Sequence, residues 1–366
     1  MRIAQIIAKG MNGGVEVVIA NYYNNLTNRN IHFDFFIENE SKIINKEMLK
    51  NGDHIYIVPP CKKLIKYGKV LKKQFKLNDY DIIHSHLNTL SVFPLYFAWK
   101  EGIKVRIASN HSTSNPKEPV RNLAKNILKL FAKKFATNYC ACSIFAGKWL
   151  FGDKAYNSGK VHIMKNAMDL NMFHFDETIR EQMRKKFQIN SSTFVIGHIG
   201  RFSKQKNHPF IIDTFCEVLK KNSDSRLILV GQGELKKEIH NLCSKKRIEE
   251  KVVFLDSVPM CEISKIYSLF DVFLFPSLYE GFGNVVAESQ AVSLECFVSE
   301  NIPDEVLFTS YAHKLKLLDG PRKWADAICN IKINKPKKDM HEIIVEKGYE
   351  IKSATKLLEE YYTKLI

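Results

Sequence analysis

The 366-residue chain has 45% hydrophobic residues, so its length and composition fit a globular protein of two ordinary domains. No apolar run reaches the roughly 18 residues of a membrane span, and the start lacks the apolar core of a signal peptide, so the sequence predicts neither. The eight cysteines are scattered, and Cys140 and Cys142 suit neither zinc nor redox spacing, so we expect reduced thiols and a cytoplasmic protein.

Positive charge is concentrated in the first part of the chain. Residues 1–165 hold 26 basic and 11 acidic residues, whereas residues 166–366 hold 29 and 28, out of a formal net charge of +16. This asymmetry predicts an anionic partner for the first part. No module of interleaved aromatic and basic residues is present, so a nucleic-acid partner is not expected.

Strand-length apolar runs alternate with longer polar segments along the whole chain. Such alternation predicts parallel sheets in two doubly wound α/β domains, with ligands beyond the carboxyl ends of the strands. We place the domains at 1–165 and 166–350, and expect a helix at about 351–366 to pack back on the first domain. The expected strands are residues 3–8, 31–37, 54–58, 81–84, 105–109, 138–143 and 161–165, then 194–199, 226–230, 252–255, 272–275 and 296–299.

A glycine-bearing segment, residues 10–16, follows the first expected strand. Gly13 and Gly14 would let backbone amides approach a phosphate or a sugar, although an ordinary strand–helix turn is the alternative. Further on, Asp79 and Asp81 form a D-x-D pair, but this pair leads into the expected strand 81–84 and so lies at the wrong edge of the sheet. No metal site is therefore predicted there.

Two segments of the first domain combine apolar and basic residues without any acid. Residues 62–77 hold seven lysines, and residues 121–136 hold five basic residues. Both can form helices with an apolar stripe and a basic remainder, which predicts peripheral binding to the anionic inner face of the cell membrane. The alternative is a pair of ordinary amphipathic helices packed on the sheet.

Polar residues follow several other expected strands. His84, His86 and His111 end two strands of the first domain, where a ligand-facing role competes with a structural one. Arg201 and Lys206 follow the first strand of the second domain and supply the positive charge that a diphosphate leaving group needs. A solvated basic loop is the alternative.

The most informative segment is 271–288, Asp-Val-Phe-Leu-Phe-Pro-Ser-Leu-Tyr-Glu-Gly-Phe-Gly-Asn-Val-Val-Ala-Glu. It predicts a buried strand, a glycine turn and a helix that begins near Asn284, with Asn284 as the N-cap. Unpaired amides and the positive helix end make such a site suitable for a phosphate. Glu280 and Glu288 would accept hydrogen bonds from sugar hydroxyls beside it.

In this order the segments resemble the retaining glycosyltransferases of family 4, and among them the bacterial enzymes that build capsule and exopolysaccharide. The resemblance extends from residue 13 to Glu305 and is strongest in residues 200–207, 231–233 and 280–288. It implies the GT-B fold, in which two Rossmann-like domains face a central cleft. The Gly-Leu-Pro turn of the family is Ser-Leu-Glu at residues 293–295 here, and the loop 301–305 lacks the usual glycines, so backbone contacts to the donor sugar are expected to differ.

The resemblance also implies roles for individual residues. Arg201 and Lys206 would hold the donor diphosphate, Glu280 would bind the donor sugar, and Glu288 would bind the ribose. Further donor contacts would come from Gly13, Gly14, Gly233, Phe282, Gly283 and Asn284. His111 would lie near the sugar and the attacking hydroxyl, and Glu16, His84 and His86 are candidates for the acceptor side.

The activity that the resemblance implies is transfer of a sugar from a nucleotide-diphosphate sugar, with UDP expected, to a hydroxyl of a glycan or a lipid-linked acceptor. It implies retained anomeric configuration and no metal or other cofactor. Two alternatives stay open. A nucleotide-sugar epimerase can share the architecture, and a non-catalytic partner subunit would have lost part of the phosphate-binding residues.

Overall fold

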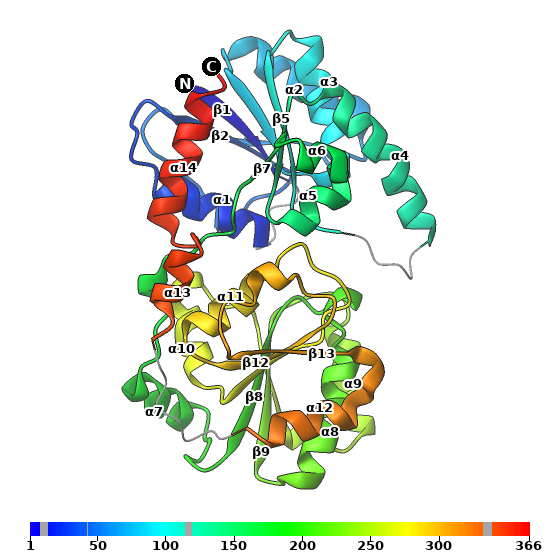
Figure 1. The fold of residues 1–366 in the computed structure, drawn as a ribbon, viewed down its shortest axis with the longest axis vertical. Helices are drawn as coiled ribbons and strands as arrows, with labels where there is room; N and C mark the ends of the chain where they lie inside the picture. The colour runs from blue at the N-terminus through cyan, green and yellow to red at the C-terminus, as the bar shows by residue number, and fades with distance from the viewer. Residues whose placement is uncertain (8–13, 42, 114–118, 332–338) are drawn as a thin grey trace. The chain divides into compact units, whose positions relative to one another are not determined.

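The computed structural model describes residues 1–7, 14–41, 43–113, 119–331 and 339–366. The chain forms two compact units (Figure 1). Unit 1 comprises Met1–Asp169 and Gly348–Ile366, and unit 2 comprises Leu170–Lys347. Each unit is a parallel sheet with helices on both faces, which confirms the α/β fold class expected from the alternating pattern.

The sheet of unit 1 has seven strands in the order β3-β2-β1-β4-β5-β6-β7, and the described pairings are all parallel. Its order reverses between β1 and β4, where Gln5 pairs in register with His84. The strands are β1 Arg2–Ile6, β2 His32–Ile37, β3 Ile55–Ile57, β4 Ile82–Ser85, β5 Val105–Asn110, β6 Asn138–Ala141 and β7 Val161–Ile163.

Helices cover both faces of this sheet because each parallel strand needs a crossover to reach its neighbour. One face carries an aromatic core that includes Phe33, Phe35, Tyr22 and Tyr362. The helices are α1 Gly14–Asn24, α2 Leu64–Leu77, α3 Val92–Lys100, α4 Pro119–Phe135, α5 Ile144–Phe151, α6 Asp153–Asn157 and, from the end of the chain, α14 Ile351–Thr363.

Helix α14 lies beside α1 on the first sheet (Figure 1). Its buried Glu359 accepts hydrogen bonds from the backbone amides of Thr27 at 2.6 Å and Asn28 at 2.9 Å. At its start, Met168 and Glu350 form a parallel β-bridge. The last residues of the chain therefore fill part of the first core.

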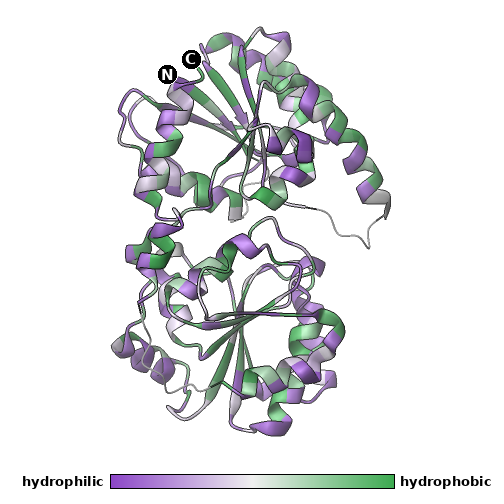
Figure 2. Cartoon of the chain, viewed as in Figure 1, coloured by the Kyte–Doolittle hydropathy of each residue, from purple (hydrophilic) through white to green (hydrophobic). Residues whose placement is uncertain are grey.

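Unit 2 has a six-stranded parallel sheet in the order β10-β9-β8-β11-β12-β13. The order reverses between β8 and β11. In Figure 2 the hydrophobic colour runs along the central strands, as expected for strands buried on both faces. The strands are β8 Phe194–Ile199, β9 Ser225–Val230, β10 Val252–Leu255, β11 Val272–Phe275, β12 Glu295–Ser299 and β13 Ala312–Leu315.

The helices of unit 2 are held to the sheet by close packing and by one buried ion-pair network. Asp271, just before β11, accepts hydrogen bonds from Arg180, from Arg184 at 2.8 Å and from the amide of Val195 at 2.7 Å. The helices are α7 Glu177–Lys186, α8 His208–Lys221, α9 Lys236–Lys245, α10 Met260–Ser268, α11 Asn284–Ala291, α12 Gly320–Cys329 and α13 His341–Glu346.

Strand β13 is the one described strand that the sequence did not predict. It reads Ala-His-Lys-Leu, lies at the edge of the sheet and is only partly buried. An edge strand that faces solvent needs no apolar run, so the pattern that marked the other strands is absent here.

The anchoring of α14 gives a stability test. We expect Glu359→Ala to lower the free energy of unfolding by about 1–3 kcal/mol, because it removes the buried carboxylate that accepts from two backbone amides and from the Thr27 hydroxyl. Hydrogen exchange of α14 and urea unfolding would measure the effect. Glu360→Ala, at the exposed neighbouring position, is the matched control, and an equal loss in both variants would contradict the anchoring role.

Candidate active site

The candidate donor site lies at the reversal of strand order in unit 2, beyond the carboxyl ends of β8 and β11. Ligands of doubly wound sheets bind at this point because two neighbouring loops turn away from each other there. Backbone and side-chain bonds tie the two loops together. The amide of Leu278 donates to the carbonyl of Gln205 at 2.8 Å, and Gln205 Nε2 donates to the carbonyl of Tyr279 at 2.8 Å.

Lys206 and Glu280 meet at the centre of this site. Lys206 Nζ lies 2.6 Å from Glu280 Oε1, and the ammonium also lies 4.5 Å from the centre of the Phe275 ring. Ser277 Oγ donates to the same carboxylate oxygen at 2.6 Å. Because an ammonium has three donors, Lys206 can hold Glu280 and still bind a phosphate oxygen.

Arg201 lies in the loop after β8 with a different partner. Its Nη2 is 3.1 Å from Glu234 Oε2, and both side chains are largely exposed. The loop after β8, which contains Phe202, packs against the loop after β9, which contains Gly233. The contact is so close that a Cβ on Gly233 would lie 2.4 Å from the Phe202 carbonyl oxygen. Gly233 has a φ of +154°, so both its conformation and its close contact require glycine. In this structure Gly233 therefore packs the loops that carry Arg201 and Glu234.

Helix α11 begins at Asn284, as the sequence predicts, but the expected N-cap is wrong. The cap is Gly283 in the left-handed conformation, with a φ of +104° and no side-chain cap bond. A glycine accepts this φ without strain and lets the chain turn directly from the buried Phe282 into the helix. The positive end of α11 thus follows Glu280 by four residues.

Glu288 is buried one turn into α11 and is held by a residue that sequence analysis missed. Tyr267 Oη, on α10, donates to Glu288 Oε2 at 2.7 Å. Burial raises the pKa of Glu288 to about 7, because the ionised form loses its hydration, and the Tyr267 hydrogen bond opposes this shift. Near neutral pH this carboxyl group can therefore take up or release a proton.

In unit 1 the three predicted histidines do lie together. His86 Nδ1 is 2.9 Å from His111 Nε2, and the rings of His84 and His86 are 4.1 Å apart. The backbone amide of His111 donates to Asn88 Oδ1 at 2.6 Å, which fixes the end of β5. Burial lowers the pKa of His111 to about 4, so its imidazole is neutral.

Two further predicted residues lie at the start of α1. Gly14 is the first residue of this helix, and Glu16 is buried in its first turn. Gly13 lies outside the described residues.

Several supporting residues escaped sequence analysis. In unit 2, Glu280 is held by Ser277 and Glu288 by Tyr267. In unit 1, His86 bonds to Gln5 and His84 to Tyr362. Ser277 lies two residues after the end of β11, a position that marks other site residues and could have identified it. Tyr267 and Tyr362 come from helices with no such signal.

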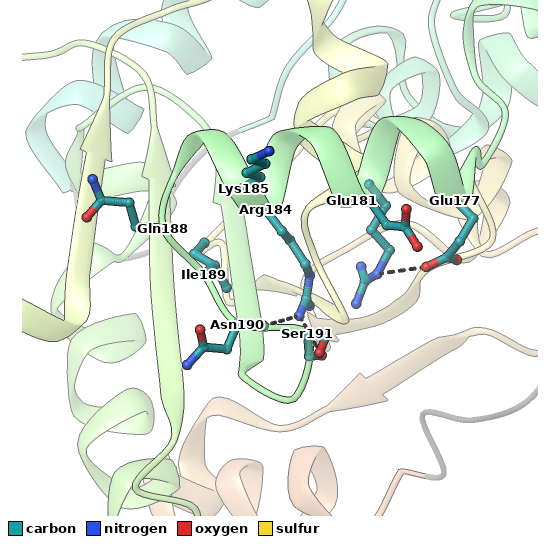
Figure 3. Close-up of a pocket in the computed structure, with 9 residues that line it drawn as sticks. Glu177, Glu181, Arg184, Lys185, Gln188, Ile189, Asn190 and Ser191 are labelled. Atoms are coloured by element: carbon teal, nitrogen blue, oxygen red, sulfur yellow. Dashed lines mark hydrogen bonds and ion pairs between the residues drawn. The ribbon is translucent and has the colours of Figure 1, made fainter.

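A further pocket of unit 2 lies away from these residues. Figure 3 shows it between α7 and the turn that follows, where Arg184 reaches the carbonyls of Asn190 and Ser191 at 3.0 Å. These residues precede β8, so the pocket lies at the amino edge of the sheet. Because both terminal nitrogens of Arg184 donate to carbonyls or to Asp271, this side chain holds α7 and its turn in place, and we assign this pocket no catalytic role.

Comparison with known proteins adds independent information. A family model described as Glycosyltransferase Family 4 matches residues 12–172, and one described as Glycosyl transferases group 1 matches residues 179–344. The chain is 28% identical over 357 residues to the Bacillus subtilis (strain 168) protein EpsF, which is named as a glycosyltransferase, covering 94% of this chain and 92% of EpsF.

Two further similarities concern a named enzyme and a solved structure. The chain is 25% identical over 251 residues to the Escherichia coli UDP-Gal:alpha-D-GlcNAc-diphosphoundecaprenol alpha-1,3-galactosyltransferase, covering 67% of this chain and 63% of that protein. The crystal structure of Anabaena HepE in complex with UDP and glucose has a TM-score of 0.82 at 17% identity, with full coverage of both chains.

The buried Glu288 gives a test of pH dependence. In the folded protein the pKa of Glu288 lies above its ordinary value of 4.5. The protonated side chain therefore stabilises the fold fully below pH 4.5, and this stabilisation is lost as the pH rises to about 7. We expect Glu288→Gln, which mimics the protonated acid, to become more stable than the native chain over this window, by up to about 3 kcal/mol. Thermal unfolding between pH 4.5 and 8 measures this. Glu238→Gln, on the exposed face of α9, is the control, and parallel curves for Glu288→Gln and the native chain would contradict the assignment.

Proposed function

Since the chain belongs to family 4 of the glycosyltransferases, with the GT-B fold, we propose that it transfers a sugar from a nucleotide-diphosphate sugar to a hydroxyl group. The observation that carries this proposal is the Lys206–Glu280 pair at 2.6 Å, at the strand reversal and directly before the amino end of α11. A cation, a carboxylate and a helix N-terminus in one place suit a phosphate joined to a sugar.

The donor diphosphate binds at the loops after β8 and β11. Lys206 and Arg201 contact the phosphate oxygens, and the amides at the start of α11 supply further donors. Glu280 accepts hydrogen bonds from the sugar, and Glu288 accepts hydrogen bonds from the ribose when it is ionised. Arg201 is exposed and pairs with Glu234 at the surface, so it can turn to a ligand at little cost.

In the reaction the bond between the anomeric carbon and the diphosphate oxygen breaks, and a bond to the acceptor oxygen forms on the same face. The proton of the acceptor hydroxyl passes to the departing diphosphate, so the anomeric configuration is retained. Negative charge grows on the leaving group, and Lys206 and Arg201 stabilise it more in the transition state than in the bound donor. These two cations act where a divalent metal acts in other transferases, and we propose that no metal or other cofactor takes part.

A UDP-sugar is the proposed donor, and a glycan or a lipid-linked glycan of bacterial surface polysaccharide synthesis is the proposed acceptor. The solved relative holds UDP and glucose, and the Escherichia coli relative is named for UDP-Gal and a diphosphoundecaprenol-linked acceptor. We assign acceptor binding to unit 1, which carries the histidine cluster and whose residues 1–165 hold 26 basic and 11 acidic residues.

The diphosphate role of the two cations is open to direct test. We expect Lys206→Ala and Arg201→Ala each to lower turnover by about 10²-fold or more, the scale for loss of one preorganised charged donor. Sugar release and transfer from a panel of UDP-sugars would be measured, with folding checked by melting temperature. Lys204→Ala removes an exposed cation from the same loop and serves as the control. Turnover close to that of the control in either folded variant would remove the proposed role.

We also propose that unit 1 docks on an anionic membrane surface through α4 rather than through α2. In α2, Tyr67, Leu71 and Phe75 are buried, so the middle of its apolar stripe packs on the protein. Its exposed apolar side chains, Leu64, Ile65 and Leu77, lie at the two ends of the helix. By contrast, four apolar side chains of α4 face solvent at helical spacing: Leu123, Ile127, Leu130 and Phe131, with exposed fractions of 63, 51, 71 and 46%.

Charge complementarity supports a lipid surface as the partner of this face. Residues 121–136 carry no acid, and Lys125 and Lys129 lie over the ring of Trp149, 5.6 and 3.6 Å from its centre. In Figure 2 hydrophobic and hydrophilic colours alternate along α4. An exposed apolar row flanked by lysines is the pattern of an interfacial helix.

Co-sedimentation with vesicles tests the docking proposal. We expect binding to vesicles that contain anionic lipid, weakening with added salt, and at least a tenfold loss of affinity when Leu130 and Phe131 are both replaced by Ser. Leu318→Ser changes the most exposed leucine of unit 2 and is the control. Equal binding of both variants, or binding that ignores lipid charge, would contradict the proposal.

A further inference from the structure

A chain of hydrogen bonds connects His111 to the far side of the first sheet. Behind His111, the ring of His86 bonds to Gln5, with His86 Nε2 2.8 Å from Gln5 Oε1. Gln5 Nε2 in turn donates to Tyr362 Oη at 3.2 Å. The same hydroxyl lies 2.7 Å from His84 Nδ1, and His84 Nε2 lies 2.6 Å from Ser109 Oγ.

The members of this chain are buried and its rings are neutral. Gln5 and His84 have no exposed surface, and His86 is 2% exposed. Burial lowers the pKa of His84 and of His86 well below the ordinary value, and neighbouring imidazoles lower it further. A neutral imidazole carries one N–H and one bare nitrogen, so a hydrogen bond at one nitrogen fixes the role of the other.

The proton direction follows from the acceptor at Gln5. The amide oxygen of Gln5 can only accept, so His86 Nε2 carries a hydrogen and His86 Nδ1 is bare. His111 Nε2 must then donate to His86 Nδ1, which leaves His111 Nδ1 without a hydrogen. Among the described residues this nitrogen has no hydrogen-bond partner, although it is shielded from solvent.

The same direction runs through the rest of the hydrogen-bonded chain. Tyr362 Oη accepts from Gln5 Nε2, so its own hydrogen points to His84 Nδ1, which is bare. His84 Nε2 then carries a hydrogen and donates to Ser109 Oγ. A reversed Gln5 amide would reverse each of these roles together, so the tautomer of His111 reports the direction of the whole chain.

We propose that Gln5, His86 and Tyr362 are positioning residues that hold His111 in the tautomer with a bare Nδ1, so that this nitrogen accepts a hydrogen bond from a substrate hydroxyl. The role toward substrate rests on the proposed function, whereas the tautomer does not. A bare, neutral and buried nitrogen orients a hydroxyl without taking its proton, which suits a reaction in which the leaving diphosphate takes it. The C-terminal helix thus reaches the site through Tyr362.

Nitrogen chemical shifts of the histidine rings test the tautomer without any activity. The full chain would be labelled with the heavy nitrogen isotope in histidine, and the His111 signals identified by their loss in His111→Gln. We expect His111 Nδ1 to resonate as an unprotonated nitrogen and Nε2 as a protonated one, from pH 6 to 8. The reverse pattern, or a mixture of both, would overturn the proposal. His162→Phe, outside the hydrogen-bond chain, should leave these signals unchanged.

Variants of His86 connect the tautomer to catalysis. His86→Phe keeps a ring but removes the nitrogen that accepts from His111. We expect His111 then to populate both tautomers and kcat to fall about tenfold, the scale of one hydrogen bond. His86→Asn places an amide oxygen where Nδ1 stood, and should restore both the His111 shifts and most of kcat. An unchanged tautomer and kcat in folded His86→Phe would overturn the positioning role. A native chain without transferase activity but with the expected shifts would count against the proposed function alone.

Discussion

Parallel strand pairing is the constraint on which both candidate sites depend. It places the carboxyl ends of the strands at one edge of each sheet, so residues far apart in the chain meet wherever two loops follow neighbouring strands. Lys206 and Glu280 are 74 residues apart and lie 2.6 Å from each other. His86 and His111 are 25 residues apart and share a hydrogen bond for the same reason. Helices on both faces bury the strands and keep these edges in register.

The two edges are built from different kinds of polar group. Unit 2 presents charged groups. Lys206 and Glu280 form an ion pair there, and the amino end of α11 adds positive potential beside them. Unit 1 presents neutral imidazoles, because burial disfavours their protonated form. Charged donors suit a leaving diphosphate, and neutral acceptors suit the orientation of hydroxyl groups. This difference follows from burial and pairing rather than from residue type alone.

Helix α14 links the end of the chain to this arrangement. It fills the core beside α1, and its Tyr362 hydroxyl bonds both Gln5 and His84. A tyrosine that had only to fill space would need no such partners. Because buried polar groups are costly unless they are paired, the network also fixes how α14 is seated. Packing of the last helix and order in the histidine cluster are therefore coupled.

The amino-acid sequence by itself determined the α/β class, twelve of the strands described here, and the start of α11. The strands were predictable because buried parallel strands need apolar runs, and the helix start because helices need glycine or polar residues at their ends. It also identified Lys206, Glu280 and the three histidines as site candidates by their position after strands. The edge strand β13 has no such pattern, and the cap of α11 is Gly283 because the turn from Phe282 needs a positive φ.

Only the tertiary structure decided which residues hold the candidates in place. Tyr267 and Tyr362 come from helices whose sequences show ordinary apolar periodicity, and their hydroxyls acquire a role when the helix is seated against a sheet. Helices α2 and α4 also have similar composition, but the middle of the apolar stripe is buried in α2 and exposed in α4. A periodic pattern fixes which face of a helix is apolar, whereas the space left by neighbouring elements decides whether that face is covered.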